Sequence, residues 1–584
     1  MNSKLLLSIF FLFAPLISQA KPQQVIEPVR LTLDADQRGA IISNALITMQ
    51  ITATGNIKSV RFGDTEMMMP GENGNTYFSY VTDSIKGGRL DADKTIVARL
   101  TDDLVEIIYQ NTNPQLNLHW AVGYIVRRGI SGYYTYATVK ADEHPNGKTE
   151  GLHEARIVHR LNPDIFNYAW VSDENQGAQP STKTLKTPLE RIQDATFLLP
   201  DSTIYTKYDY CNYVKDDSLH GMMGNNFGAW LITPSFEWVN GGVNKQELTV
   251  HSDDKSPLIL QMFQSQHFGS GTTYFKKNQQ KMYGPALVYY NQGTREQMIA
   301  DAKSKTAQEL THHPYQWMKH ELFPLKRGKV KGRITIEKSF NTNRFQVILA
   351  QPGSSFTQQG NDYQYWTETD AQGNFTIQNI RPGNYSLYAY ALNGEATGIF
   401  EKDDISVKTG NNDLGTQTWN LQKYGKTLWQ IGQANHLASE FRLSNHPRQY
   451  GAFNEVPANL DYTIGTSLPE KNWYYAQTQN GRWDIYFHLE DTYTQPLLLT
   501  IATAGAANQV RANVIVNGSR VGIIKTVNDS GIYRSAMQSG QPDLFTFSIS
   551  PELLKVGKNK LTLQLNGVKH VGGIMYDCIK LESK

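Results

Sequence analysis

The stretch Gly132-Tyr-Tyr-Thr-Tyr-Ala-Thr-Val139 consists almost entirely of aromatic, β-branched and small residues. Residues of these types suit the pleated, half-buried surface of a β-sheet. Ala45–Thr52 and Leu104–Tyr109 have the same character, and similar short runs recur between turns over residues 21–323. This region therefore predicts a large antiparallel β-sandwich, and it gives little support to a helical or a doubly wound α/β fold.

One stretch of the same region is compatible with a helix. Around Gln297–Glu309, the side chains of Met298, Ile299 and Ala302 can share one face. We expect a helix there that closes the sandwich.

Two further β domains follow. Gly328–Ile336 begins a new series of strands over residues 324–422, which predicts a compact sandwich of about a hundred residues that acts as a rigid spacer. Residues 423–584 contain strands at regular intervals and predict a β jelly roll of the kind found in carbohydrate-binding modules. Within it, Asn517-Gly518 indicates a tight hairpin, because both central positions of a type I′ turn need positive φ.

The first twenty residues have the pattern of a secretory signal. A charged start is followed by an apolar run from Leu5 to Ile17 and by Ser18-Gln19-Ala20, so we expect cleavage after Ala20 and export, with periplasm and exterior both open. That run is too short for a stable membrane span, and no later stretch approaches about 18 uninterrupted apolar residues. No contact with a membrane is therefore expected.

Charge and cysteine content exclude several classes of protein. The 584 residues carry a net charge of only +2 with both signs interspersed, which speaks against binding to nucleic acid. Cys211 and Cys578 cannot form a disulfide framework, and we expect two free, buried thiols. No phosphate-binding loop, nucleophile elbow or regular metal-ligand spacing stands out. A structural calcium ion is possible in an exported β protein, although no ligand cluster locates it.

The polar residues of the first domain leave two catalytic chemistries open. A glycoside hydrolase needs two carboxylates that flank the bond, and candidates are Asp209, Asp216, Asp217 and Glu237. A lyase acting on a uronic acid needs instead a cation for the carboxylate, a base for the C5 proton and an acid for the leaving oxygen. Arg156, Lys207 and His267 could serve in these three roles.

Seven stretches, in this order, resemble the rhamnogalacturonan lyases of polysaccharide lyase family 4 across essentially the whole mature chain. They are Glu154–Leu161, Thr206–Tyr210, Pro234–Gly242, Ser265–Gly271, Tyr283–Pro285, Leu428–Gly432 and Met575–Glu582. The resemblance implies a galactose-mutarotase-like sandwich, a fibronectin type III-like sandwich and a jelly roll. It also implies a rhamnogalacturonan polysaccharide as the partner, and we expect a monomer.

The resemblance assigns roles to three residues. Lys207 falls on the family's catalytic lysine, His267 on its catalytic histidine, and Arg156 on the arginine that engages the galacturonate carboxylate. Should His267 not be the acid, His220 and His251 are alternatives.

Further substrate contacts are expected from aromatic and basic residues. Leu260 and Met262 replace aromatic residues that some fungal members carry, and Tyr205 and Tyr208 could compensate for them. Arg534 is the candidate for an arginine that reaches the cleft from the terminal domain.

The implied reaction is a β-elimination that leaves a 4,5-unsaturated galacturonate and needs no redox cofactor. A lysine base must be neutral, although an unperturbed lysine has a pKa of about 10.4. Burial and repulsion from Arg156 are expected to lower the pKa of Lys207, so we expect activity at neutral to alkaline pH. The alternative from another class is a non-catalytic pectin-binding protein.

Overall fold

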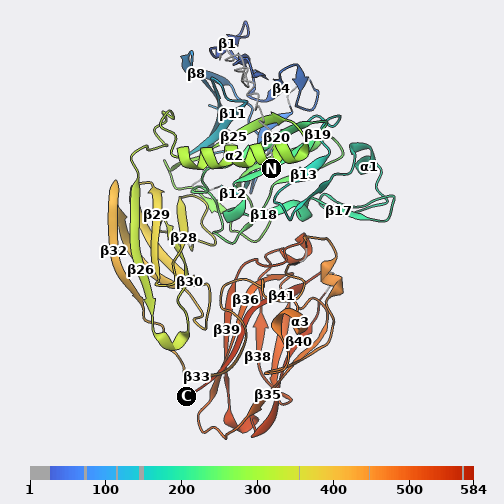
Figure 1. Cartoon of the computed structure of the whole chain (residues 1–584), viewed down its shortest axis with the longest axis vertical. Coiled ribbons are helices and arrows are strands. Elements are labelled where there is room, and N and C mark those ends of the chain that lie inside the picture. The colour runs from blue at the N-terminus through green and yellow to red at the C-terminus, as the bar shows by residue number, and fades with distance from the viewer. Residues whose placement is uncertain are drawn as a thin grey trace, which may run out of the picture.

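The computed structural model describes residues 27–71, 75–112, 116–143, 150–353, 355–445, 447–568 and 571–584. Three groups of strands follow one another, with residues 30–292 at the top of Figure 1, 328–419 at the lower left and 426–583 at the lower right. The predicted signal over residues 1–20 lies outside the described residues. Among the helices of the described chain, none is both long and apolar enough to cross a membrane.

The first group forms the predicted large sandwich, in which the strands within each sheet are antiparallel. One sheet has the order β1 (Arg30–Leu33), β2 (Ala40–Ser43), β3 (Ile47–Ile51), β4 (Ile57–Phe62), β6 (Thr76–Thr82), β12 (Gly151–Arg160), β23 (Pro257–Gln264), β22 (Val250–Ser252), with β5 (Thr65–Glu66), β7 (Gly88–Arg89) and β24 (Thr273–Tyr274) at its sides. The other has the order β14 (Gln176–Ala178), β13 (Tyr168–Trp170), β19 (Leu219–Gly224), β20 (Phe227–Ile232), β25 (Gln280–Gln292), β11 (Gly132–Ala141), β10 (Leu118–Arg127), β9 (Leu104–Gln110), β8 (Lys94–Thr101).

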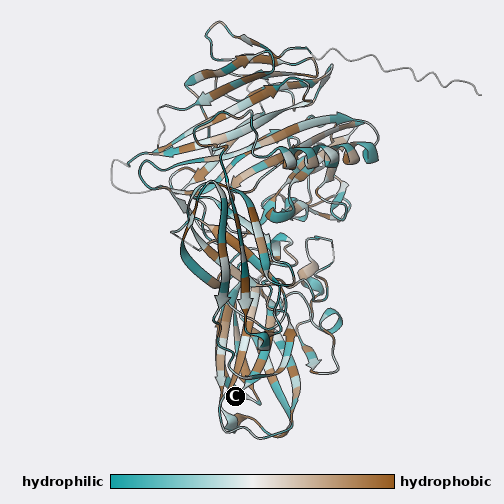
Figure 2. Ribbon diagram, turned by 60° about the vertical axis from the view of Figure 1, so that its left-hand side comes forward, coloured by the Kyte–Doolittle hydropathy of each residue, from teal (hydrophilic) through white to brown (hydrophobic). Residues whose placement is uncertain are grey.

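Alternation along the strands sends apolar side chains between these two sheets. Ala155 and Ile157 of β12 are fully buried in the same core as Val122 and Tyr124 of β10. Because successive side chains of a strand point to opposite faces, Arg156 and its even-numbered neighbours project outward from this core. Figure 2 shows the apolar segments as brown bands within the strands. The core thus fixes which β12 side chains are left for a site on the outer face.

The predicted helix is present and is longer than expected. Helix α2 spans Arg295–His312, starts with a capping box between Thr294 and Gln297, and buries Met298 and Ala302 against the second sheet. It crosses the front of that sheet in Figure 1. The other two helices of the described chain are short, α1 (Thr182–Lys186) and α3 (Pro469–Asn472).

Two small sheets lie beside the sandwich and carry catalytic candidates. One contains β15 (Glu190–Gln193), β16 (Thr196–Leu198) and β17 (Ile204–Thr206), and the other pairs β18 (Cys211–Tyr213) with β21 (Gln246–Leu248). The chain passes from β17 directly into a 3-10 turn over Lys207–Tyr210. The β15–β17 sheet, called the satellite sheet below, therefore sets the position of Lys207.

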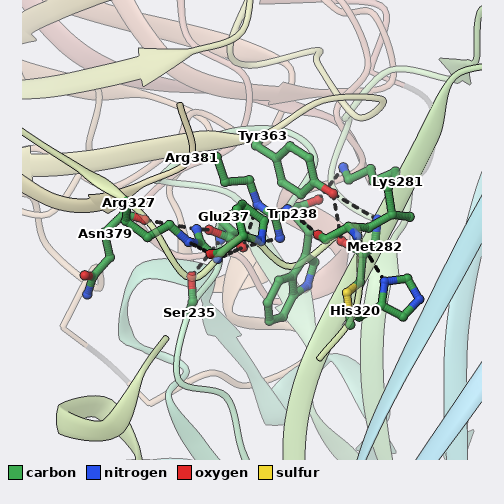
Figure 3. A network of polar contacts seen from close by, with 12 residues as sticks. Ser235, Glu237, Trp238, Lys281, Met282, His320, Arg327, Tyr363, Asn379 and Arg381 are labelled. Atoms are coloured by element: carbon green, nitrogen blue, oxygen red, sulfur yellow. Dashed lines mark hydrogen bonds and ion pairs between the residues drawn. The ribbon is translucent and has the colours of Figure 1, made fainter. Parts of the chain in front are cut away.

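The second group is a small sandwich, as expected. Its sheets have the orders β29 (Asn374–Ile380), β26 (Gly328–Ile336), β32 (Gly410–Trp419) and β28 (Gln364–Glu368), β27 (Phe345–Ala350), β30 (Gly383–Ala391), β31 (Phe400–Val407). A buried ion cluster joins it to the first group. Glu237 is 0 % exposed and accepts hydrogen bonds from Arg327 (2.6 Å) and Arg381 (2.6 Å), as Figure 3 shows.

The third group packs two sheets face to face, as expected for a jelly roll. The orders are β33 (Lys426–Gly432), β41 (Gly573–Ser583), β36 (Leu497–Ala507), β39 (Asp543–Ile549) and β34 (Leu460–Thr463), β35 (Gly481–Leu489), β40 (Gly557–Asn566), β37 (Arg511–Val516), β38 (Ser519–Lys525). Asn517 and Gly518 have φ values of 47° and 91°, which confirms the predicted tight hairpin between β37 and β38. Cys211 and Cys578 are both free and buried, as predicted.

Candidate active site

A pocket of about 220 Å³ lies on the outer face of β12. Arg156, Val158 and Arg160 line it, since they alternate with the side chains that face the core. Their neighbours across the sheet complete the floor: Val158 pairs with Tyr77 of β6 on one side and with Leu260 of β23 on the other. The pocket therefore has an apolar floor with two arginines set into it.

Lys207 reaches this pocket from the satellite sheet. Its backbone N–H donates to the carbonyl oxygen of Ala195 (3.0 Å), which holds the start of the 3-10 turn against the β15–β16 turn. The side chain is only 7 % exposed, and Nζ lies 2.5 Å from Oδ2 of Asp194. Burial acts to raise the pKa of Asp194, but the Lys207 ammonium outweighs it and holds that pKa below its usual value.

Arg156 and His267 are connected through one carboxylate. Nη2 of Arg156 lies 3.1 Å from Oε1 of Glu154, and Nε2 of His267 lies 3.6 Å from Oε2 of the same side chain. The Arg156 side chain is 26 % exposed. Because a guanidinium carries five N–H donors, donors other than the one on Glu154 are left for a carboxylate that enters the pocket.

His267 has a second carboxylate on its other side. Nδ1 lies 3.8 Å from Oε1 of Glu247, which is fixed by Lys245 (2.7 Å) and by the hydroxyl of Ser265 (2.6 Å). Burial lowers the pKa of His267 below its usual value, with Lys207 adding to the shift. The imidazole is therefore favoured in its neutral form near pH 7.

Tyr208, which follows Lys207 in the 3-10 turn, and Arg534 of the third domain lie next to each other at one side of the site. Nζ of Lys207 lies 5.1 Å and Cζ of Arg534 lies 5.0 Å from the centre of the Tyr208 ring, which itself is fully buried. Nη1 of Arg534 donates to the carbonyl oxygen of His267. The structure thus brings Lys207, His267, Tyr208 and Arg534 together, although 327 residues separate Lys207 from Arg534 (534 − 207).

Tyr205, like the fully buried Tyr208, does not have the open ring face that the predicted contact with a sugar requires. It is 6 % exposed, and its hydroxyl donates to Gln179 (2.7 Å) and accepts from the backbone N–H of Ser252 (2.7 Å). Its ring packs with Leu185 and Phe197 in a small apolar cluster. Because the ring is packed and the hydroxyl is hydrogen-bonded within the protein, Tyr205 offers little surface to a sugar.

Five charged residues of the pocket were not predicted from the sequence: Arg160, Arg191, Asp194, Asp253 and Asp254. Arg160 and Asp253 form a bidentate pair with N–O distances of 2.9 and 2.8 Å. Arg160 could have been found, because a residue four positions after Arg156 in a strand shares its face. Asp194 lies in a turn and follows no pattern.

The two alternative histidines occupy different places. His251 lines the pocket with a buried Nδ1 that has no hydrogen-bond partner, and burial lowers its pKa to about 3. His220 is 2 % exposed and is paired with Asp217 (2.8 Å), so its Nδ1 is already engaged.

The carboxylates considered for hydrolysis do not line this pocket. Glu237 belongs to the junction between the first and second domains, Asp217 is paired with His220, and Asp209 accepts from the hydroxyl of Ser535 (2.6 Å) at the contact with the third domain. Asp216 is exposed, next to Asp217 in the chain. Among the described residues, no group of three or more His, Cys, Asp or Glu side chains is arranged to hold a metal ion.

Comparison with known proteins decides the family. Three family models match the chain: Rhamnogalacturonate lyase family over residues 76–194, and Polysaccharide lyase family 4, domain II and domain III, over residues 327–413 and 427–581. A rhamnogalacturonate lyase from Dickeya dadantii is 32 % identical, over 95 % of this chain and 94 % of that one. The chain belongs to the rhamnogalacturonate lyase family.

Other relatives are more distant. A probable rhamnogalacturonate lyase B from Aspergillus niger is 25 % identical over 79 % of this chain and 75 % of its own. Among solved structures, a galactose mutarotase-like protein from Lactobacillus casei matches 43 % of this chain and all of its own, with 12 % identity and a TM-score of 0.27. As a member of the rhamnogalacturonate lyase family, the protein is a polysaccharide lyase, which confirms the family expected from the seven stretches.

Proposed function

We propose that the protein cleaves the rhamnose-(1,4)-galacturonate linkage of rhamnogalacturonan by β-elimination, which breaks the C4–O4 bond of galacturonate, with Lys207 as the base. The observation that carries the proposal is the placement of Lys207 and the partly exposed Arg156 guanidinium in one pocket. A galacturonate carboxylate bound by Arg156 presents its C5 proton within the same small space as the lysine.

Arg156 would act mainly on the transition state. As the C5 proton leaves, negative charge moves onto the carboxylate, so a guanidinium beside it stabilises the transition state more than the ground state. Part of the interaction with Glu154 can be exchanged for the substrate carboxylate, because a guanidinium carries five donors.

Lys207 would take the proton as a free amine, and the C5–H electrons would form the C4–C5 double bond as the C4–O4 bond breaks. The departing oxygen stays on C1 of rhamnose and becomes a hydroxyl with a proton from solvent. Because burial lowers the pKa of His267, its neutral imidazole can donate an N–H hydrogen bond to that oxygen as it leaves. No redox cofactor enters this balance.

The cellular setting is part of the proposal. The signal pattern over residues 1–20 supports export, and nothing in the reaction requires a partner other than the polysaccharide, so we propose an exported monomer. A bound structural calcium ion stays a prediction.

The test compares two polysaccharides. With rhamnogalacturonan, the protein should generate the ultraviolet absorbance of an unsaturated uronate, and with homogalacturonan it should not, since that polymer lacks the rhamnose leaving group. Saturated new ends without the absorbance would show hydrolysis instead, and binding without new ends would show a non-catalytic protein.

A further inference from the structure

Of the arginine and lysine side chains that line the pocket, three are paired with a carboxylate and one is not. Arg156 is paired with Glu154 at 3.1 Å, Arg160 with Asp253 at 2.8 Å and Lys207 with Asp194 at 2.5 Å. Arg191 also lines the pocket, but within the described chain it has no carboxylate partner. Its guanidinium is therefore available to an anion from outside.

Arg191 is nevertheless held in place. It belongs to β15, pairs with Phe197 of β16, and its Cζ lies 5.0 Å from the centre of the Phe197 ring. Phe197 is 2 % exposed and anchored in the apolar cluster of the satellite sheet. Two residues further along β15, Gln193 donates to the carbonyl oxygen of Tyr533 in the third domain (3.0 Å). An arginine presented in this way loses less conformational entropy when it binds than a free surface side chain does.

The rim beside Arg191 carries negative charge. Asp194 and Asp254 also line the pocket, and the Asp194 side chain is 66 % exposed. These carboxylates repel an anionic chain, so a uronate that passes them needs a cation at the same place. Arg191 can supply it, and its planar fork can bind a carboxylate through two hydrogen bonds.

We infer that Arg191 forms a second uronate subsite, which binds the carboxylate of a galacturonate next in line to the one held by Arg156. The inference rests on the proposed function, because rhamnogalacturonan alternates rhamnose with galacturonate and so offers a second carboxylate one rhamnose away. Arg191 then favours a substrate in which uronates alternate with neutral sugars over a single uronate. It is a binding residue and takes no part in the proton transfer.

The test uses backbone fragments of increasing length with wild type, Arg191→Gln and Arg191→Lys. The shortest fragments that react should be cleaved equally by all three. Once a fragment is long enough to place a second uronate, KM for Arg191→Gln should rise about ten-fold or more while kcat changes little, which is the size expected for a charged hydrogen-bonded contact. Arg191→Lys should recover part of the loss.

Arg482→Gln is the matched control, since Arg482 is an exposed strand arginine of the third domain outside the pocket. It should behave as wild type on every fragment. An equal loss for short and long fragments in Arg191→Gln would mean that Arg191 only supports the satellite sheet, and no loss at any length would mean that it binds nothing. Either result overturns the inference.

A binding measurement separates this inference from the proposed reaction. If wild type yields no unsaturated uronate, the lyase proposal fails, and calorimetric titration of the uncleaved fragments still reports on Arg191. A ten-fold weaker affinity of Arg191→Gln for long fragments alone then supports the subsite, and equal affinities at all lengths contradict it.

Discussion

Lys207 and Asp194 form an ion pair, and both follow directly on strands of one small sheet, Asp194 on β15 and Lys207 on β17, so this sheet positions the base together with its counter-ion. The pair explains how a lysine can be 7 % exposed without an unbalanced charge. At the residue scale, Asp194 therefore holds Nζ of Lys207 in place at the edge of the pocket.

Replacement of Asp194 tests this pairing. Because the Lys207 ammonium holds the folded-state pKa of Asp194 below its usual value, the pair stabilises the fold above about pH 4, and this contribution is lost as pH falls. Asp194→Asn should therefore melt at a lower temperature than wild type at pH 7, and the difference should shrink below about pH 4. Melting curves over a pH series measure it, and equal melting temperatures at pH 7 would show that the pair does not stabilise the site.

The sequence predicted some of these residues and not others, for physical reasons. The roles of Arg156, Lys207 and His267 came from the resemblance, because the proximity of these side chains depends on how the β15–β17 sheet docks on the sandwich. Arg160 was not predicted, although a period of two would have placed it on the strand face of Arg156. Asp194 sits in a turn where Ala195 has a φ of 43°, and no periodicity marks such a position.

At the scale of elements, Glu237 joins the first two domains. Burial acts to raise its pKa, but the guanidinium groups of Arg381 and Arg327 outweigh this and hold the pKa well below its usual value. A carboxyl whose folded-state pKa is depressed contributes stability above its unfolded-state pKa, and the contribution is lost as pH falls below that value. The junction should therefore weaken below about pH 4.3.

Glu237→Gln should lower stability by about 3–5 kcal/mol at pH 7, because it leaves two buried guanidinium groups without their charge partner. Scanning calorimetry should show a lower melting temperature, which also responds less to acidification below about pH 4 than that of wild type. Activity at low temperature should be kept, since Glu237 lies outside the pocket. A variant as stable as wild type would contradict the role of Glu237 at this junction.

The elements themselves were largely predictable. β26 was expected over Gly328–Ile336 and spans those residues, and the Asn517-Gly518 hairpin follows from turn chemistry alone. Helix α2 extends beyond the expected stretch because the capping box at Thr294 starts it earlier. The ion pairs of Glu237 at the junction of the first two domains could not be predicted from the sequence. Its partners lie 90 and 144 residues further along the chain (327 − 237 and 381 − 237).

At the scale of the whole molecule, the third domain is part of the site. Arg534 contacts the His267 backbone, and Ser535 donates to Asp209, so a 3-10 turn of the jelly roll forms one wall of the site. Burial raises the pKa of Asp209 to about 7. A carboxyl with a raised folded-state pKa is held in its protonated form by the fold. Asp209 therefore contributes its full stabilisation of the folded state below about pH 4, and this contribution is lost as pH rises through about 7.

Asp209→Asn should remove this dependence, because the amide cannot ionise and its oxygen can still accept from Ser535. The variant should melt at a higher temperature than wild type at pH 8.5, and show no such gain near pH 4. Melting curves of wild type and Asp209→Asn at the two pH values measure this. The same difference in melting temperature at both pH values would contradict the raised pKa of Asp209.

The central claim is that Lys207 removes the C5 proton, and Lys207→Arg tests it most directly. The guanidinium keeps a positive charge opposite Asp194 but is too weak an acid to serve as a free base. The initial rate of unsaturated-uronate formation from rhamnogalacturonan should fall by a factor of about 10²–10⁴ relative to wild type, with substrate affinity retained. A rate within a few-fold of wild type would contradict the claim.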